Sequence, residues 1–273
     1  MKKDKYKFIT YVFPLTCLIA TSSTLSMFPR RKFEQIDRQT ALHRAASSIF
    51  FSINKTRNAL ERSDVDIQNQ RGQTALHVVH KGNVAQLLLT EGANQDAPDH
   101  NNNTPLHAAA QYDRLSVAKQ LLRAGSSIEA RNHEQCTPLH LAARHGHERI
   151  ILLLCTAHAN VNAIMNTGQT PLHLATQFGH DKAAITLIAN GARVGTPVQI
   201  SQTPHDVIDQ RKMTPLAYAV NKKQFNLAIE LVRAGACTSV ISDRNMLKEL
   251  HNRFIAMGGN PETAAILFEI VDK

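Results

Sequence analysis

Histidine is the residue that most invites a chemical interpretation of this sequence. The chain holds 14 histidines among 273 residues, and histidine is both a frequent general base and the commonest metal ligand. Zinc sites use fixed spacings such as HExxH or cysteine pairs two residues apart, and the sequence contains neither. It also lacks the GxSxG and GxxxxGK segments typical of hydrolases and nucleotide-binding enzymes. We therefore expect no catalytic residues, no metal and no cofactor.

Many of these histidines share one place in a recurring string, Thr-(Ala/Pro)-Leu-His. The string occupies residues 40–43, 74–77, 104–107, 137–140 and 170–173, and a worn copy, Thr-Pro-Leu-Ala, follows at 214–217. Successive threonines are separated by 34, 30, 33, 33 and 44 residues. A side chain that returns with each repeat is typical of a scaffold, so we expect structural roles for these positions. They include Thr74, His77, Thr104, His107, Thr137, His140, Thr170 and His173.

The residues around each string predict two short helices per repeat. Threonine is a good N-cap, and proline after it suits the first helical position. A glycine 21 residues after the threonine, as at Gly125, Gly191 and Gly235, would end the second helix in the left-handed conformation. His158 replaces it once, and Gly92 comes after only 18 residues, so the second copy lacks three helical residues. Such helices fall short of the ~12–15 residues needed alone, so they must stack.

This pattern closely resembles the ankyrin repeat over residues 37–242. The resemblance implies an all-α ankyrin-repeat solenoid of helix-turn-helix units with β-hairpin fingers, in about six repeats. These would start near residues 37, 71, 101, 134, 167 and 211. It further implies that the motif histidine ties neighbouring hairpin loops by hydrogen bonds, and that the concave face and finger tips bind partners.

The regions flanking the repeats have their own signatures. Residues 1–7 are basic, residues 8–20 carry no charge, and small polar residues follow, which is the layout of a secretory signal peptide over residues 1–22. An N-terminal anchor and a docked or disordered tail are the alternatives. Residues 23–36 form a basic linker. With a genuine signal the protein is exported, either secreted or periplasmic; without one it is cytoplasmic, and only an uncleaved N-terminal segment would contact a membrane.

Two further segments depart from the repeat. Helical spacing in residues 243–273 predicts a C-terminal helical cap over the last repeat, with a separate binding domain as the alternative. Extra residues near 195–205 indicate an insertion in the fifth finger, which is either a binding loop or an inert surface loop.

The charge distribution bears on the class of partner. The net charge is +9, but seven basic residues and one acidic residue precede residue 33, which leaves +3 for the rest of the chain. The repeats are therefore close to neutral, and we expect no nucleic acid as a partner. No pattern indicates a small-molecule substrate, so the expected partner is an unidentified protein.

The resemblance implies that candidate partner-binding residues on the concave face and the finger tips come just before each motif threonine and at the end of the first helix of each repeat. They are His100, Asn101, Asn103, Gln111, Tyr112, His133, Glu134, Arg144, His145, Asn166, Thr167, Gln169, Gln177 and Phe178. Gln70, Arg71, Gln73, Cys136, Asn221 and Lys222 occupy equivalent positions. Tyr112 and Phe178 have the profile of interface anchors, being aromatic on a polar strip; partial burial against the adjacent repeat is the alternative.

These observations predict a protein-binding scaffold or adaptor. A basic leader followed by such repeats is similar to the exported repeat proteins of host-associated bacteria, whose partner would be a host protein. A periplasmic protective or partner-binding protein and a cytoplasmic scaffold are alternatives. An enzyme that uses the repeats as a docking arm ranks last, because no segment of sufficient length remains for a catalytic domain.

Overall fold

The computed structural model describes residues 42, 43, 46, 56, 64–195, 214–241, 243–261 and 264. The expected signal peptide, the basic linker, most of the first repeat, residues 196–205 of the insertion and the last part of the C-terminal region lie outside the described residues.

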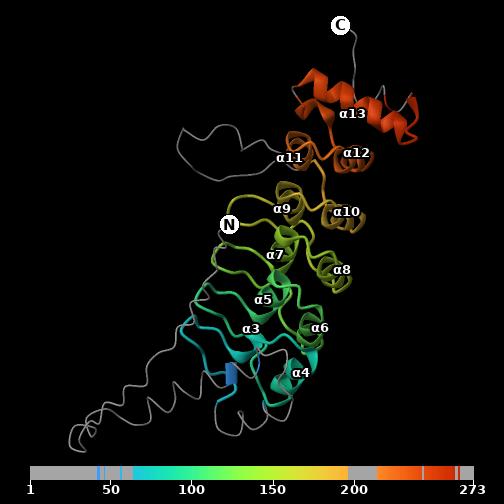
Figure 1. Ribbon diagram of the computed structural model, residues 1–273. Helices are drawn as coiled ribbons and strands as arrows, with labels where there is room; N and C mark the ends of the chain where they lie inside the picture. The colour runs from blue at the N-terminus through green and yellow to red at the C-terminus, as the bar shows by residue number, and fades with distance from the viewer. Residues whose placement is uncertain are drawn as a thin grey trace, which may run out of the picture.

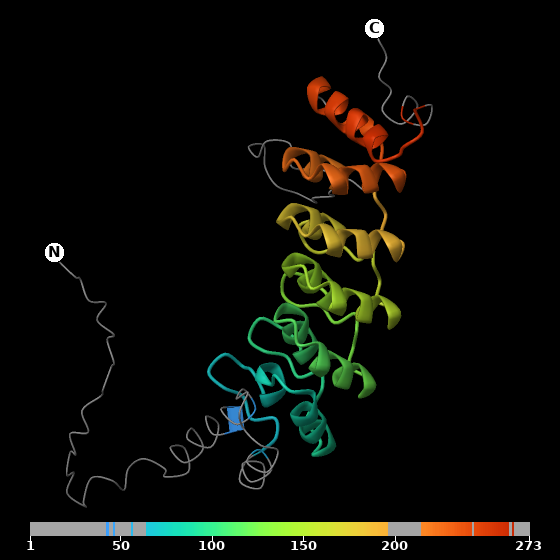
Figure 2. The same ribbon diagram turned by 45° about the vertical axis from the view of Figure 1, so that its right-hand side comes forward.

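The described part of the chain is a stack of helix pairs (Figure 1). Its helices are α3 (Ala75–Val78), α4 (Gly82–Thr90), α5 (Pro105–Gln111), α6 (Leu115–Arg123), α7 (Pro138–His145), α8 (Glu148–Thr156), α9 (Pro171–Phe178), α10 (Asp181–Ala189), α11 (Pro215–Asn221), α12 (Phe225–Arg233) and α13 (Arg244–Ala256), with a 3-10 turn, η2 (Thr238–Val240). No strand occurs in these ranges. Odd-numbered helices from α3 to α11 form an inner row beside the projecting loops, and even-numbered helices form an outer row (Figure 2). This confirms the predicted all-α solenoid.

Each inner helix begins at the threonine of its string. Thr74, Thr104, Thr137, Thr170 and Thr214 are the N-cap residues of α3, α5, α7, α9 and α11, all with extended backbone angles. Where the string contains proline, the proline is the first helical residue, where its missing N–H costs no hydrogen bond. The helices stay short, and α3 is shortest with four residues because the second repeat lacks three.

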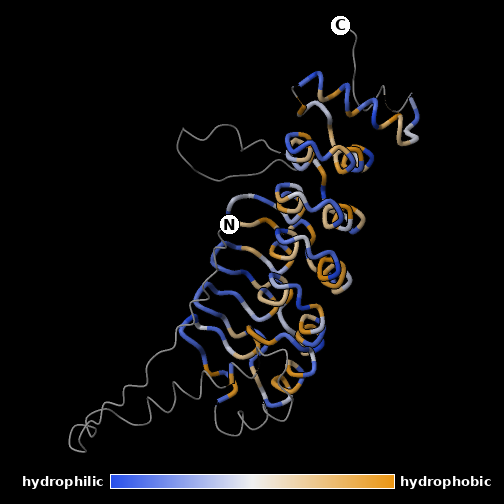
Figure 3. Tube along the Cα trace, in the orientation of Figure 1, coloured by the Kyte–Doolittle hydropathy of each residue, from blue (hydrophilic) through white to orange (hydrophobic). Residues whose placement is uncertain are grey.

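The core runs continuously along the stack between the two helix rows. The leucine of each string is fully buried, as at Leu106, Leu139 and Leu172, and packs with alanine, valine and isoleucine from the outer helices. Burial of one such leucine contributes about 1.5–3 kcal/mol. Figure 3 shows apolar residues gathered along the helices and hydrophilic residues in the projecting loops. The repeats thus bury their core only against one another.

The predicted left-handed positions are present where outer helices end. Gly125, Gly191 and Gly235 have φ values of 83°, 88° and 93°, and His158 at the equivalent place has φ 65°. An L-residue in this region costs about 1–2 kcal/mol, so His158 carries local strain that glycine would avoid.

The projecting loops are tight hairpins. In each, a main-chain N–H bonds to a carbonyl four residues later: Asn69 to Gln73 at 2.9 Å, Asp99 to Asn103 at 2.9 Å, Asn132 to Cys136 at 3.1 Å, and Met165 to Gln169 at 3.0 Å. The family resemblance implied β-hairpin fingers. Each described loop is closed by one hydrogen bond of this kind, and no residue of these loops forms a β-strand.

The C-terminal end of the described stack is α13, which packs against α12. Asp243 caps it by accepting hydrogen bonds from the main-chain N–H groups of Asn245 and Met246. Leu250 and Phe254 are buried on the face toward the stack. Within the described ranges, every helix is too short or too polar to cross a membrane.

Candidate partner-binding site

Two parallel rows of side chains build the concave face of the stack. The first row lies in the loops, three residues before each motif threonine, at Arg71, Asn101, Glu134 and Thr167. The second row lies at the ends of the inner helices, seven and eight residues after the threonine, at Gln111 and Tyr112, Arg144 and His145, and Gln177 and Phe178. Because the repeats stack in register, residues one period apart occupy neighbouring places along the same row.

Side-chain oxygens inside the loops fix the first row. Asp99 Oδ1 accepts the main-chain N–H of Asn101 and of Asn103, both at 2.8 Å. Asn132 Oδ1 does the same for Glu134 at 3.0 Å and Cys136 at 2.9 Å. Such bonds hold a turn in one conformation. The loop residues are therefore held in place before any partner arrives.

Main-chain bonds then tie each loop to the next. The N–H of His100 donates to the carbonyl of Arg71, that of His133 to Asn101, and that of Asn166 to Glu134, each at 3.1 Å. The loops therefore form one continuous wall of the concave face.

The motif histidines add a buried second tie. Nδ1 of His140 accepts the N–H of Thr137 at 3.2 Å, so that nitrogen carries no proton. The proton is then on Nε2, which donates to the carbonyl of Gln169 in the following loop at 3.3 Å. His43, His77 and His107 make the equivalent bonds to the carbonyls of Gln73, Asn103 and Cys136, at 2.7, 2.9 and 3.0 Å.

Burial keeps these rings neutral. Desolvation lowers the pKa of His140 to about 4, against a weaker opposing effect of its bond to Gln169. Burial likewise lowers the pKa values of His77 and His107. A ring with both nitrogens engaged and no solvent access has nothing left for a metal or a substrate.

A further tie that the sequence analysis missed joins the far ends of the inner helices. His147 and His180, the N-cap residues of α8 and α10, donate through Nε2 to the carbonyls of Gln111 and Arg144 in the preceding repeat, at 3.0 and 3.1 Å. Their place ten residues after the motif threonine repeats in the sequence, and this recurrence is a signal that could have revealed them. Arg114 occupies the same place in the preceding repeat and reaches the carbonyl of His77 at 2.6 Å.

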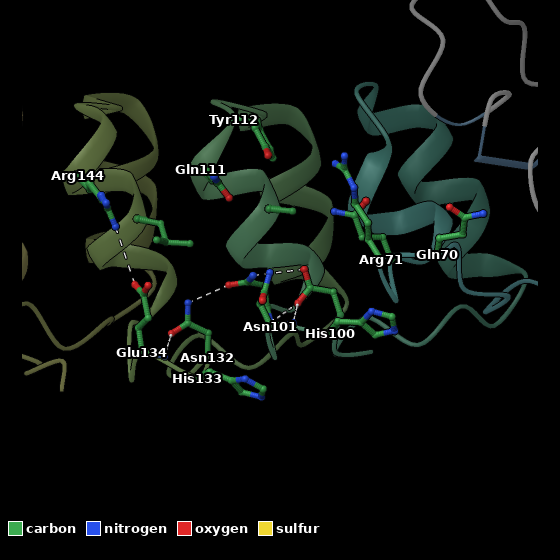
Figure 4. A pocket seen from close by; sticks show the side chains of 15 residues that line it. Gln70, Arg71, His100, Asn101, Gln111, Tyr112, Asn132, His133, Glu134 and Arg144 are labelled. Carbon is green, nitrogen blue, oxygen red and sulfur yellow. Dashed lines mark hydrogen bonds and ion pairs between the residues drawn. The ribbon is translucent and has the colours of Figure 1, made fainter.

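The concave face is hollowed where three repeats meet (Figure 4). The groove has a volume of about 720 Å³. Eight predicted residues line it: His100, Asn101, Asn103, Gln111, Tyr112, His133, Glu134 and Arg144. Gln70, Arg71 and Gln73 line it too, together with four residues that were not predicted: Asp99, Ala108, Asn132 and Leu141. The groove therefore runs from the loop of the second repeat to α7.

Cys136, Asn221 and Lys222 do not line this groove, and neither do six of the fourteen main candidates: His145, Asn166, Thr167, Gln169, Gln177 and Phe178. His145 stacks against His147 instead, with ring centroids 5.9 Å apart. The rest of these six lie one repeat farther along, where Gln169 Nε2 donates to Gln177 Oε1 at 2.8 Å and the Thr167 hydroxyl donates to Gln169 Oε1 at 3.1 Å.

The two aromatic candidates remain accessible. Tyr112 is 56% exposed and Phe178 is 46% exposed. The Arg114 guanidinium lies 4.9 Å from the centre of the Tyr112 ring, and that of Arg144 lies 5.4 Å from the Phe178 ring. These cation–π contacts steady each ring and leave about half of it open to solvent.

The arrangement offers binding surface rather than reactive groups. Burial, with a smaller effect of Glu134, raises the pKa of the Cys136 thiol to about 12, so it stays protonated at neutral pH. In the described part of the chain, no three histidine, cysteine, aspartate or glutamate side chains gather where a metal ion could be held.

Comparison with known proteins identifies the repeats. The family model described as ankyrin repeats (three copies) matches residues 42–132 and 124–197, which together cover more than half of the chain. No curated protein matches. The period, the capped helix pairs and the looped wall agree with that match, and the chain belongs to the ankyrin repeat family.

Proposed function

We propose that this protein is a scaffold that holds a segment of another protein in the groove between the loops of the second to fourth repeats and the ends of α5 and α7. Ankyrin repeats generally mediate protein–protein interaction and are typically non-enzymatic. The observation that carries the proposal is the half-exposed ring of Tyr112 in a groove of about 720 Å³ whose loop wall is already fixed by hydrogen bonds. A preformed wall reduces the entropy that a partner must overcome, and an exposed aromatic supplies the anchor.

The proposal is tested with a matched pair of variants. Tyr112→Ala removes the anchor from the groove, whereas Leu152→Ala removes an apolar side chain of similar exposure, 50%, from the outer helix α8. Peptides selected from a displayed random library on the wild-type protein are measured against both variants by isothermal titration calorimetry. We expect Tyr112→Ala to weaken binding about tenfold or more, the range of interface hot spots, and Leu152→Ala to leave it unchanged. Equal affinities for both variants would remove the groove as the binding surface.

We also propose that the protein is exported and that its partner lies outside the cytoplasm, as a host protein if the source is a host-associated bacterium. The basic, apolar and small-residue order of residues 1–22 supports export. N-terminal sequencing of the protein purified from its natural cells tests this. A start at Ser23 in a non-cytoplasmic fraction is expected; an intact Met1 in the cytoplasm would leave an intracellular scaffold.

A further inference from the structure

The second repeat is shorter than its neighbours on the side that faces the groove. Its inner helix α3 ends at Val78 after four residues, whereas α5, α7, α9 and α11 have seven or eight. The next helix is capped by Lys81, only seven residues after Thr74, where other repeats need ten. In the third and fourth repeats, this turn carries the groove-lining residues Gln111, Tyr112 and Arg144. The part of the groove beside the end of α5, lined by Arg71, Gln111 and Tyr112, is called the notch.

The missing turn leaves Arg71 without a residue opposite to it. In the fourth repeat the equivalent loop residue, Glu134, faces Arg144 at the end of α7, with 3.9 Å between Oε2 and Nη1. Arg71 has no such counterpart, because α3 stops before that point. Within the described residues its side chain forms no hydrogen bond or ion pair, and it is exposed in the groove lining. Figure 4 shows it reaching from its loop toward the end of α5 that carries Gln111 and Tyr112.

The carboxylates of the groove are already engaged elsewhere. Asp99 accepts two main-chain N–H groups through Oδ1 and the Asn103 amide through Oδ2 at 3.3 Å. Glu134 is paired with Arg144. On the other side of the notch, the Arg114 guanidinium lies against the Tyr112 ring, and its buried Nε has no hydrogen-bond partner among the described residues. Among the described residues that line the groove, no carboxylate is therefore left to offset the charge of Arg71.

We propose that the notch between Arg71 and Tyr112 is a carboxylate-binding subsite, which takes an aspartate or glutamate side chain of the protein segment held in the groove. This inference rests on the proposed function and names the chemistry of its partner. Guanidinium and carboxylate form short, charge-assisted and often paired hydrogen bonds, which give orientation as well as affinity. The Tyr112 ring packs against the CH2 groups of the partner's aspartate or glutamate. A partner without an acidic residue at that point does not make this contact with Arg71.

The test uses the full chain and a library of random peptides, fused at their C-termini to a coat protein so that no free carboxyl terminus competes. Peptides selected on the wild type are expected to be enriched in aspartate and glutamate over the unselected library. Amidated synthetic copies are then titrated against Arg71→Glu. We expect the affinity to fall about tenfold or more, as for a reversed charge contact, and to fall less for Arg71→Lys. Arg149→Glu, the same charge change on the outer helix α8, should not alter it.

A second selection on Arg71→Glu provides the reciprocal result, because its peptides should carry lysine or arginine in place of the acidic residue. The failures are distinguishable. Peptides that depend on Tyr112 but lack acidic enrichment, or that bind Arg71→Glu as tightly as the wild type, overturn the subsite and leave the groove function standing. Peptides that do not depend on Tyr112 at all overturn both.

Discussion

Arg114 donates a hydrogen bond from Nη1 to the main-chain carbonyl of His77, 2.6 Å away in the preceding repeat. In the next two repeats, histidine makes the corresponding bond to a carbonyl seven residues after the motif threonine, whereas His77 lies only three residues after it. The acceptor is thus one helical turn farther back, because α3 ends at Val78. The long arginine side chain spans the turn that the second repeat lacks.

The Arg114 bridge should matter for stability. Arg114→Ala is expected to lower the free energy of unfolding by about 1.5–3 kcal/mol, the range for a hydrogen bond to a charged group. Arg114→His introduces the residue that serves in the neighbouring repeats, yet we expect a similar loss because imidazole cannot reach the His77 carbonyl. Urea denaturation followed by circular dichroism measures both. If Arg114→His were as stable as the wild type, the long arginine side chain would not be needed to join the two repeats.

Stability should depend on pH through the motif histidines. In the folded protein the pKa of His140 is lowered to about 4, below its ordinary value of 6.5. Between these values the unfolded chain binds a proton that the folded chain does not, so stability is full above pH 6.5 and is lost as the pH falls toward 4. His140 alone contributes up to roughly 3 kcal/mol to this loss, and His77 and His107 act in the same direction.

Urea unfolding at pH 7 and at pH 4.5 measures the effect. His140→Gln is expected to be less stable than the wild type at pH 7, because it breaks the tie to Gln169, but to lose less on acidification. His133→Gln, at an exposed loop position, is the control and should keep the pH dependence of the wild type. A wild type equally stable at both pH values would contradict neutral buried histidines.

His158 offers a stabilising change. It is exposed and has φ 65°, in the place where other repeats have glycine. His158→Gly relieves a backbone cost of about 1–2 kcal/mol, offset in part by the greater entropy of glycine in the unfolded chain. We therefore expect a gain of up to about 1 kcal/mol, detected as a higher midpoint of thermal unfolding. A lower midpoint would mean that the imidazole makes a favourable contact that outweighs its strain.

Two glycines separate backbone strain from steric fit. Gly125 and Gly146 both have positive φ, 83° and 74°. A Cβ at Gly125 would meet open space, whereas one at Gly146 would lie 2.5 Å from Nδ1 of His180. The same ring is held in place through its Nε2, which donates to the Arg144 carbonyl. Gly125→Ala should cost about 1 kcal/mol, and Gly146→Ala about 1–3 kcal/mol more, because the ring must move. Equal losses in calorimetric unfolding would indicate that His180 yields without cost.

The fold was predictable because its determinants are local and repeated. A threonine that caps a helix and a leucine that enters the core recur with the period, so the helix rows follow from the sequence. Asn69, Asp99 and Asn132, which fix the loops, also recur five residues before the threonine and were overlooked. The extent of the groove was not predictable in the same way. Gln177 and Phe178 fit the period as well as Gln111 and Tyr112, but the hollow depends on how neighbouring loops and helix ends close in space.

The Arg114 bridge lay beyond sequence analysis for a related reason. Its acceptor, the His77 carbonyl, depends on where α3 ends. The sequence shows only that the second repeat is three residues shorter, not at which residue its first helix ends. The period locates the side chain ten residues after the motif threonine, but it does not show which carbonyl that side chain reaches.

The shortened α3 has a meaning for how such a protein can change. The second repeat lacks one turn of the groove wall, and the Arg114 side chain still joins it to the third repeat. The shape of the groove can therefore change in one repeat without loss of the contacts that hold neighbouring repeats together. Shortening the end of α5 or α7 by one turn, with arginine in place of His147 or His180 respectively, should create a similar notch elsewhere along the same surface. A protein built this way can acquire new specificities by small edits in length.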